Sequence, residues 1–203
     1  MVVKTLEKNG VKVVFGYPGA ANCPIIDKLS FSSIKHILTR NEQGAAHMAS
    51  GYARVTKQAG VCTATSGPGA TNLITGIATA YMDSIPMVAL TGQVATKLIG
   101  KDAFQEVDIT GATLPFTKHS YLIKDGLDIP RVVNEAFHIA NTGRPGPVLI
   151  DFPMDLLKKE FDYPEEDEDV NIRGYKLMGK ANESQVKKVA EAIKGAKKPV
   201  IPV

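Results

Sequence analysis

Hydrophobic positions along the chain form two alternating patterns. Between short apolar runs, residues spaced three and four apart predict amphipathic helices at 21–29, 42–57, 70–81 and 129–141. The apolar runs themselves, rich in β-branched residues, predict buried strands at 11–15, 34–38, 61–65, 86–90 and 148–151. Strands that alternate with helices and are apolar throughout predict a mainly parallel sheet with helices on both faces. We therefore expect a doubly wound α/β fold.

Unusual turn sequences directly follow the first three predicted strands. They are GYPG at 16–19, RNEQG at 40–44 and SGPG at 66–69. In doubly wound folds, ligands bind at the carboxyl ends of the strands. The sequence therefore predicts a ligand site at this edge of the sheet.

The periodic pattern ends near residue 160. Residues 161–181 carry no apolar period and include the acidic run 165–169, which is typical of a solvated linker. We expect a domain at 1–160, this linker at 161–181, and at 182–203 the start of a truncated second domain. Within that start, 183–193 predicts a helix and 199–203 a strand. The chain is thus expected to be a fragment.

Composition narrows the functional classes. The chain has 203 residues, 44% hydrophobic and 22% charged, as in ordinary globular proteins. A net charge of only +3 argues against a nucleic-acid partner, which needs a concentrated basic face. The apolar runs are too short for a membrane span, and the lysines near the start interrupt any export signal. Two cysteines are too few for a disulfide framework, so we expect a reducing, cytoplasmic location.

The glycine-rich segment SGPGATN at 66–72 joins a strand to a helix. A dinucleotide fingerprint would need a third glycine where the chain has Asn72. A nucleophile elbow around Ser66 would need glycines in place of Ala64 and Pro68. The segment therefore predicts a tight strand-to-helix turn whose backbone amides can face an anion.

Glu42 opens a predicted helix directly after Asn41, a good capping residue. One interpretation is structural, because a carboxylate in the first turn gains roughly 0.3 to 1 kcal/mol from the helix dipole. The other is catalytic, because a carboxylate at the end of a strand faces the ligand crevice of this fold.

Two further groups have ordinary interpretations. The four histidines show no metal-ligand spacing, so we expect no metal site within this chain. The tract DAFQEVD at 102–108 is typical of the start of a short amphipathic helix with Phe104 in the core.

Five motifs together carry a resemblance that none of them carries alone. They are VFGYPGAA at 14–21, NEQGAAHMASGYAR at 41–54, TSGPGATN at 65–72, DAFQEVD at 102–108 and GRPGPVLIDFPMD at 143–155. In order and spacing, the chain resembles the catalytic large subunit of the acetolactate (acetohydroxyacid) synthases. It is similar to the amino-terminal domain, which binds the aminopyrimidine ring of thiamine diphosphate. The likeness covers about residues 11–157, and the segment from 182 resembles the start of that family's central domain.

The resemblance implies a role for individual residues. Glu42 would hydrogen-bond the pyrimidine ring nitrogen, and Gln105 would donate to an oxygen on which negative charge develops. Arg144 would contact FAD, although a cation that stabilises a helix end is its ordinary alternative. The other residues implied to line the cofactor and the reacting carbonyl are Tyr17, Pro18, Gly19, Thr65, Pro68, Asn72 and Phe104.

The resemblance also implies an activity and its partners. The family decarboxylates pyruvate and condenses it with a second 2-ketoacid, pyruvate or 2-ketobutyrate, on the route to branched-chain amino acids. Its members hold the diphosphate through Mg2+ on a separate domain with a GDG motif, which these 203 residues lack. Because the site lies between subunits, we expect a dimer or tetramer, with a regulatory small subunit as a further partner, and an inactive fragment. Other thiamine-dependent decarboxylases, oxidases or carboligases, and a non-catalytic module, stay as alternatives.

Two positions depart from the family pattern. Ala20 stands where the family usually has a second glycine after YPG, which adds a methyl group beside the expected reaction site. Met154 stands where the family often has a lysine, so contacts of that lysine do not transfer. The choice between the FAD-containing biosynthetic type and the FAD-free catabolic type therefore stays open.

Overall fold

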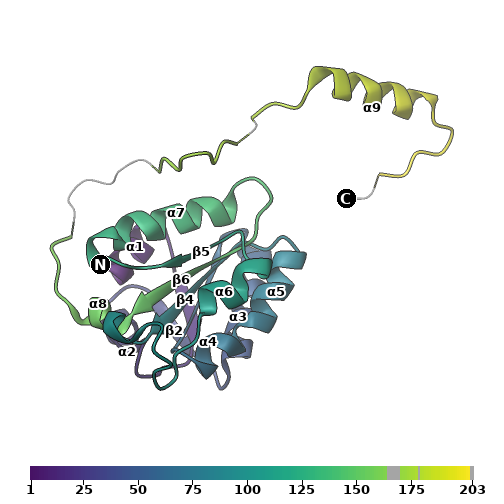
Figure 1. Ribbon diagram of the computed structural model, residues 1–203. Coiled ribbons are helices and arrows are strands. Elements are labelled where there is room, and N and C mark those ends of the chain that lie inside the picture. The colour runs from purple at the N-terminus through teal and green to yellow at the C-terminus, as the bar shows by residue number, and fades with distance from the viewer. Residues whose placement is uncertain (164–169, 178, 202–203) are drawn as a thin grey trace. The chain divides into compact units, whose positions relative to one another are not determined.

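The computed structural model describes residues 1–163, 170–177 and 179–201 (Figure 1). By internal contacts the chain divides into two units, Met1–Ile172 and Arg173–Val203, and each is described by itself below. The division falls inside the predicted linker. The acidic run 165–169 lies outside the described residues, and the domain boundaries at 160 and 181 stay predictions.

The first unit is built on six parallel strands. Their order across the sheet is β2-β1-β3-β4-β6-β5, which confirms the expected parallel, doubly wound arrangement. The central strands β3, β4 and β6 are buried at every position, as nearly continuous apolar runs predict. The strands are β1 (Val13–Gly16), β2 (Lys35–Leu38), β3 (Gly60–Ala64), β4 (Met87–Gln93), β5 (His119–Leu122) and β6 (Pro147–Pro153).

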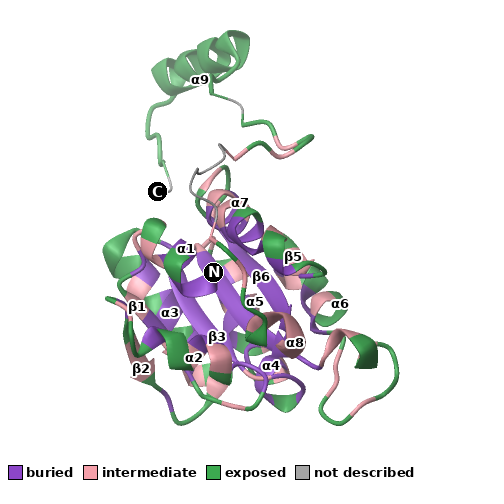
Figure 2. Cartoon of the chain, turned by 90° about the vertical axis from the view of Figure 1, so that its left-hand side faces the viewer, coloured by how far each residue is buried: buried purple, intermediate pink, exposed green. Residues whose placement is uncertain are grey.

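Helices cover both faces of this sheet, so that its central strands form the buried interior in Figure 2. Helices α1 and α7 pack together on one face, and α3 and α5 pack together on the other. The α-helices are α1 (Val2–Lys8), α2 (Cys23–Leu29), α3 (Glu42–Thr56), α4 (Pro68–Asn72), α5 (Ile74–Met82), α6 (Ile109–Thr113), α7 (Ile129–Asn141) and α8 (Met154–Lys158). Short 3-10 helices add η1 (Thr96–Leu98), η2 (Leu114–Phe116) and η3 (Gly126–Asp128).

The predicted helix at 70–81 is wrong as a single element. It starts two residues earlier, with Pro68 at its first position, and a turn at Leu73 divides it into α4 and α5. Proline suits a helix start because its fixed φ is already helical and its missing N–H has no partner there anyway.

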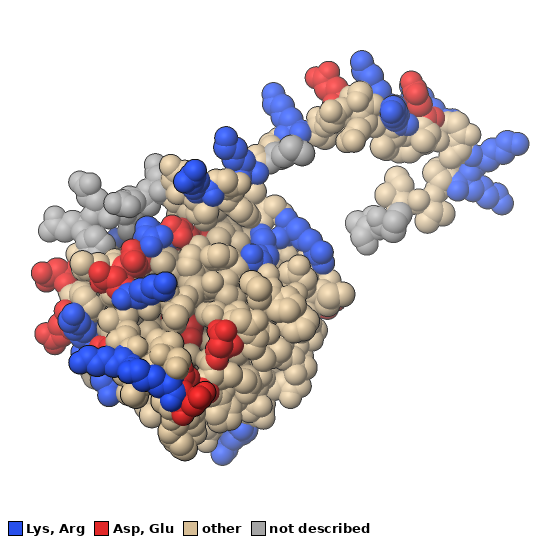
Figure 3. Space-filling view, in the orientation of Figure 1, with Lys and Arg blue, Asp and Glu red and all other residues tan. Residues whose placement is uncertain are grey.

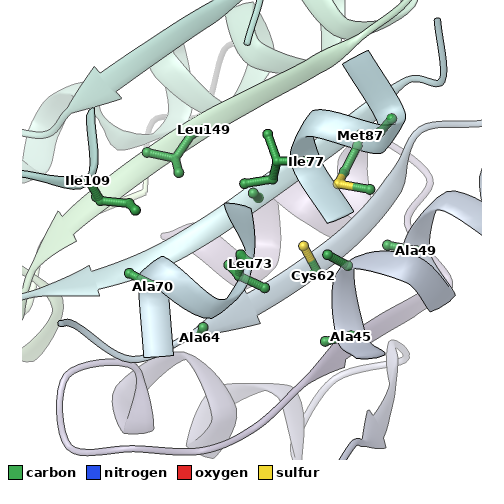
Figure 4. Close-up of a cluster of buried hydrophobic side chains, with 13 residues drawn as sticks. Ala45, Ala49, Cys62, Ala64, Ala70, Leu73, Ile77, Met87, Ile109 and Leu149 are labelled. Carbon is green, nitrogen blue, oxygen red and sulfur yellow. The ribbon is translucent and has the colours of Figure 1, made fainter. Parts of the chain in front are cut away.

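Small residues let α3 approach the sheet closely. Ala45, Ala46 and Ala49 belong to the cluster of buried side chains in Figure 4, between α3, α5 and the sheet. A Cβ added to Gly60 of β3 would overlap the carbonyl of Ala49, and one added to Gly76 of α5 would overlap the Cβ of Ala46. Because neither strand nor helix can shift without a clash, the start of α3 is fixed at the carboxyl edge of the sheet.

The first residues of the predicted linker pack onto the first unit. The ring of Phe161 lies against Gly126, where an added Cβ would overlap it. The hydroxyl of Tyr163 lies 3.2 Å from Thr5 Oγ1, and Lys8 Nζ lies 4.7 Å from the ring centroid. These contacts extend the packed unit at least as far as residue 163.

The second unit contains α9 (Glu183–Gly195), which confirms the helix predicted at 183–193. Its first turn is capped by Asn182, whose side chain accepts from the N–H of Ser184 and Gln185. The predicted strand at 199–203 is wrong for 199–201, which take no strand conformation, and 202–203 are not described. A strand needs a neighbour to bond its backbone, and the structure gives this segment none in the described part of its unit. Among the helices described, none combines the length and apolar character that crossing a membrane requires.

Candidate functional site

Glu42 is placed by the first turn of α3. The side chain of Asn41 accepts hydrogen bonds from the N–H of Gln43 at 2.7 Å and of Gly44 at 3.4 Å, which is the expected helix cap. Since the packing of α3 against the sheet is close, the Glu42 carboxyl is held at the carboxyl edge by a rigid element rather than by a loop.

Two predicted site residues meet at this half-buried carboxyl. Asn72, at the end of α4, donates from Nδ2 to Glu42 Oε2 at 3.1 Å. A Cβ added to Gly69 would lie 3.5 Å from Glu42 Oε1 and 2.8 Å from Thr65 Cγ2. The missing Cβ therefore avoids a clash with Thr65, and Gly69 lies near the second carboxyl oxygen. Asn72 binds one carboxyl oxygen, and no hydrogen bond from the described residues reaches the other.

The turn after β1 contacts the end of β3 through a hydrogen bond and close packing. Ala21 N–H donates to Thr65 Oγ1 at 3.1 Å, and a Cβ on Gly19 would lie 2.5 Å from Thr65 Cβ. Pro18 and Tyr17 stand at the rim of this turn, and Tyr17 is 42% exposed. The structure thus brings the GYPG and SGPG turns together, as their places after parallel strands predict.

The buried side chain of Asn22 holds this turn by hydrogen bonds, a role that the sequence did not predict. Its Oδ1 accepts from Gly19 N–H at 2.7 Å, and its Nδ2 donates to Tyr17 O and to Thr63 Oγ1, both at 3.2 Å. An asparagine one residue before a helix is typical of a cap, yet this side chain makes no capping bond. The only signal available in the sequence was its place beside the GYPG turn.

Gln105 lies against the turn between β3 and α4. Gly67 has φ +59°, and a Cβ there would lie 2.6 Å from the carbonyl oxygen of Gln105 and 2.9 Å from its Cα. Only a glycine permits this approach. The expectation of a short helix through 102–108 with Phe104 in the core is wrong: Phe104 is 89% exposed, and α6 starts at Ile109. The Asp108 side chain caps that helix and so marks where it begins.

A second missed group lies under the loop that carries Gln105. Asp151 of β6 is buried and accepts from Thr91 Oγ1 at 2.7 Å and from Gln93 Nε2 at 2.8 Å. Gln93 also donates to the carbonyl of Val107 at 2.8 Å. Burial raises the pKa of Asp151 to about 6, and the two hydrogen bonds oppose this rise.

Arg144 is not brought to this site. It precedes β6 and lies at the amino edge of the sheet, where its Nε donates to Ser84 Oγ at 2.8 Å and its Nη2 to Met82 O at 3.2 Å. Met82 ends α5, so these contacts fit the helix-end cation of its ordinary interpretation, and the contact of Arg144 with FAD stays a prediction.

Charge adds little to the site. In Figure 3, acidic and basic side chains of the first unit are interspersed, and no single basic area dominates the visible face. In the part of the chain that the structure describes, no three histidine, cysteine, aspartate or glutamate side chains are grouped to hold a metal ion. What the carboxyl edge offers is one positioned carboxyl, an amide that holds it and two glycine turns.

Comparison with known families defines the class. The family model described as "Thiamine pyrophosphate enzyme, N-terminal TPP binding domain" matches residues 1–112, more than half of the chain. The chain belongs to this family. The fold and the resemblance expected from the motifs are thereby confirmed.

Individual relatives narrow the class further. The chain is 51% identical to the acetolactate synthase of Arthrospira platensis over 205 aligned residues. The alignment covers 98% of this chain and 35% of the relative. The chain is 55% identical to the acetolactate synthase large subunit IlvB1 of Mycobacterium tuberculosis, over 98% of this chain and 32% of the relative. It is 54% identical to a probable acetolactate synthase large subunit of Methanocaldococcus jannaschii, over 98% of this chain and 34% of the relative. The chain spans about a third of the length of these relatives.

Proposed function

We propose that this chain is the pyrimidine-binding domain of an acetolactate synthase. The parent protein would decarboxylate pyruvate and condense it with a second 2-ketoacid, pyruvate or 2-ketobutyrate, in branched-chain amino acid synthesis. The identity of 51–55% to acetolactate synthases over 98% of the chain supports this assignment. The observation that carries it is the Glu42 carboxyl at the carboxyl edge of the sheet: Asn72 binds one of its oxygens, and no hydrogen bond from the described residues reaches the other.

The residues at the carboxyl edge fit thiamine diphosphate. Oxygen Oε1 of Glu42 receives no hydrogen bond from the described residues, and a carboxyl oxygen suits a ring nitrogen as hydrogen-bond partner. Thiamine diphosphate, when bound, supplies an acidic carbon and an electron sink for decarboxylation. The other residues proposed to line the ring and the reacting carbonyl are Tyr17, Pro18, Gly19, Thr65, Pro68 and Phe104.

The protein's own groups then have separate tasks. Glu42 would share a proton with the ring nitrogen, and its bond to Asn72 fixes the plane of the carboxyl for that purpose. Gln105 would donate to the substrate oxygen on which negative charge develops. Because Gly67 and Gln105 are in close contact, the backbone that carries this donor is held at the turn after β3.

Other components belong to the parent protein. We propose that Mg2+ and the diphosphate are held by a domain outside these 203 residues, that a second copy completes the site, and that a regulatory small subunit binds the assembly. For FAD, the hydrogen bonds of Arg144 at the end of α5 give no support, and we derive no step through it. The free cysteines, exposed Cys23 and buried Cys62, fit the proposed reducing, cytoplasmic location.

Activity of the full-length protein that contains this chain tests the proposal. We expect acetolactate from pyruvate, and Glu42→Gln should lower kcat about 100-fold or more, since general acid–base groups contribute that much. Glu183→Gln is a matched control, because Glu183 also follows a capping asparagine at the start of a helix. Near-normal turnover of Glu42→Gln would contradict the assignment.

Product analysis separates the alternatives in the same assay. Acetaldehyde, acetyl phosphate or tartronate semialdehyde in place of acetolactate would identify another thiamine-dependent enzyme on this fold. No product from any 2-ketoacid, with thiamine diphosphate and Mg2+ supplied, would favour the non-catalytic module.

A further inference from the structure

The tip of the loop that carries Gln105 has an unusual backbone. Within residues 100–106, three residues take left-handed conformations: Gly100 with φ +79°, Asp102 with φ +52° and Gln105 with φ +58°. Side chains other than glycine rarely adopt this conformation, because the Cβ approaches the following carbonyl. The tip therefore needs contacts that hold it there.

The carboxylate of Glu106 supplies such contacts. It accepts hydrogen bonds from the N–H of Gly100 and, at 2.9 Å, from the N–H of Ala103. The backbone N–H of Glu106 donates to Ala103 O at 3.0 Å and closes the turn. These backbone hydrogen bonds lower the pKa of Glu106, as expected for an anion surrounded by amide donors.

Hydrogen bonds of other side chains hold the two ends of the loop, and among the side-chain hydrogen bonds of the described residues only those of Glu106 reach the tip. At the first end, Asp155 accepts from the N–H and the hydroxyl of Thr96 at 2.9 and 2.6 Å. At the second end, Gln93 bonds the carbonyl of Val107. Apolar packing does not hold the tip, since Phe104 is 89% exposed.

We propose that Glu106 is a positioning residue whose carboxylate fixes the left-handed tip and so sets Gln105 against the turn at Gly67. The inference rests on the proposed function for the role of Gln105 in the reaction. It assigns no contact with substrate to Glu106, which acts through the backbone of its neighbours.

The first experiment measures the tip itself, without any reaction. In the 203-residue chain, amide hydrogen exchange at Gly100 and Ala103 should be about tenfold faster in Glu106→Gln, because the amide group offers these donors a weaker acceptor. Asp102→Asn is the matched control: it removes the same charge from the same tip, and its carboxylate has no hydrogen bond within the described residues. Unchanged exchange in Glu106→Gln would overturn the proposal.

The second experiment is a double-mutant cycle in the full-length enzyme. Glu106→Gln should lower kcat about tenfold and change KM less than about twofold, because it displaces a group that acts in the transition state. In a Gln105→Ala background the same change should have no further effect, whereas a merely structural residue would cost as much in both backgrounds. Equal losses in both backgrounds, or full activity of Glu106→Gln, would overturn the catalytic part of the proposal.

The two experiments separate this inference from the proposed function. If Gln105→Ala retains full activity, the proposed role of Gln105 fails and the catalytic part of the inference fails with it. The exchange measurement still decides whether Glu106 fixes the tip.

Discussion

At the scale of single residues, glycines decide which groups meet at the carboxyl edge. Gly19 lies against Thr65, Gly67 admits the backbone of Gln105, and Gly69 folds its turn back on Thr65. At Gly19 and Gly67, two loops come closer than any side chain would allow. The site therefore depends as much on missing Cβ atoms as on the polar groups themselves.

Gly67→Ala tests this dependence. The substitution combines an unfavourable positive φ with a Cβ placed 2.6 Å from a backbone oxygen, so we expect a loss of about 3 kcal/mol in the free energy of unfolding. Chemical denaturation measures it. As a control, Gly51→Ala lies inside α3 with nothing within 4 Å of the added Cβ, and it should stabilise by roughly 0.5–1 kcal/mol. Equal stability of both variants would contradict the packing argument.

The buried carboxyl of Asp151 predicts how the stability of the fold depends on pH. Its folded pKa of about 6 lies above its ordinary value of 3.8, so the folded state keeps the proton over this interval while the unfolded state releases it. Its contribution to stability therefore falls as pH rises from about 4 to 6, by about 3 kcal/mol in total. Asp151→Asn, which imitates the neutral acid, should gain stability relative to wild type over the same interval. Urea denaturation at pH 4, 5, 6 and 7 measures the free energy of unfolding of both proteins. If the two values change in parallel with pH, the prediction is wrong.

The sequence predicts some of these residues and not others for physical reasons. Glu42, Thr65 and Asn72 could be grouped because each follows a parallel strand or closes the helix after it. The bond of Asn22 to Thr63 and the bonds of Asp151 could not be predicted, because these partners lie 41 and 58–60 residues away and are brought close only by sheet pairing. The exposure of Phe104 was also missed, because a large apolar side chain indicates burial unless the local backbone is known.

At the scale of elements, α3 is the support on which the site depends. Its alanines and the glycines that face them hold it against β3 and α5, and its capped first turn presents Glu42. This element was predicted from its apolar period and its cap almost to the residue. The edge strand β5 was not, because its HSYL sequence is neither apolar throughout nor fully buried.

Removing the cap tests the support directly. Asn41→Ala should lower the free energy of unfolding of the first unit by about 1 kcal/mol, because the N–H groups of Gln43 and Gly44 lose their acceptor. Asn182→Ala removes the same type of cap from α9 and should leave the unfolding of the first unit unchanged. Hydrogen exchange resolved by residue measures both, and equal effects on the first unit would contradict the prediction.

At the scale of the whole molecule, the candidate site lies at the carboxyl edge of the first unit. The carboxyl edge carries a positioned carboxyl and turn glycines, and no group of acidic ligands for a metal occurs among the residues described. The chain spans about a third of its relatives, and we propose that the remainder of the parent protein supplies the diphosphate site. Most of the packed unit was predictable because strand and helix periods are clear outside residues 102–122, whereas residues 161–181 have no such period.

The central claim is that Glu42 hydrogen-bonds the ring nitrogen of thiamine diphosphate, and nuclear magnetic resonance tests it most directly. Thiamine diphosphate with isotopically labelled pyrimidine nitrogens is bound, with Mg2+, to the full-length protein, to Glu42→Gln and to the control Glu183→Gln. We predict that one ring nitrogen shifts toward its protonated value in the wild type and in Glu183→Gln, and does not in Glu42→Gln. The same shift in all three proteins would contradict the account.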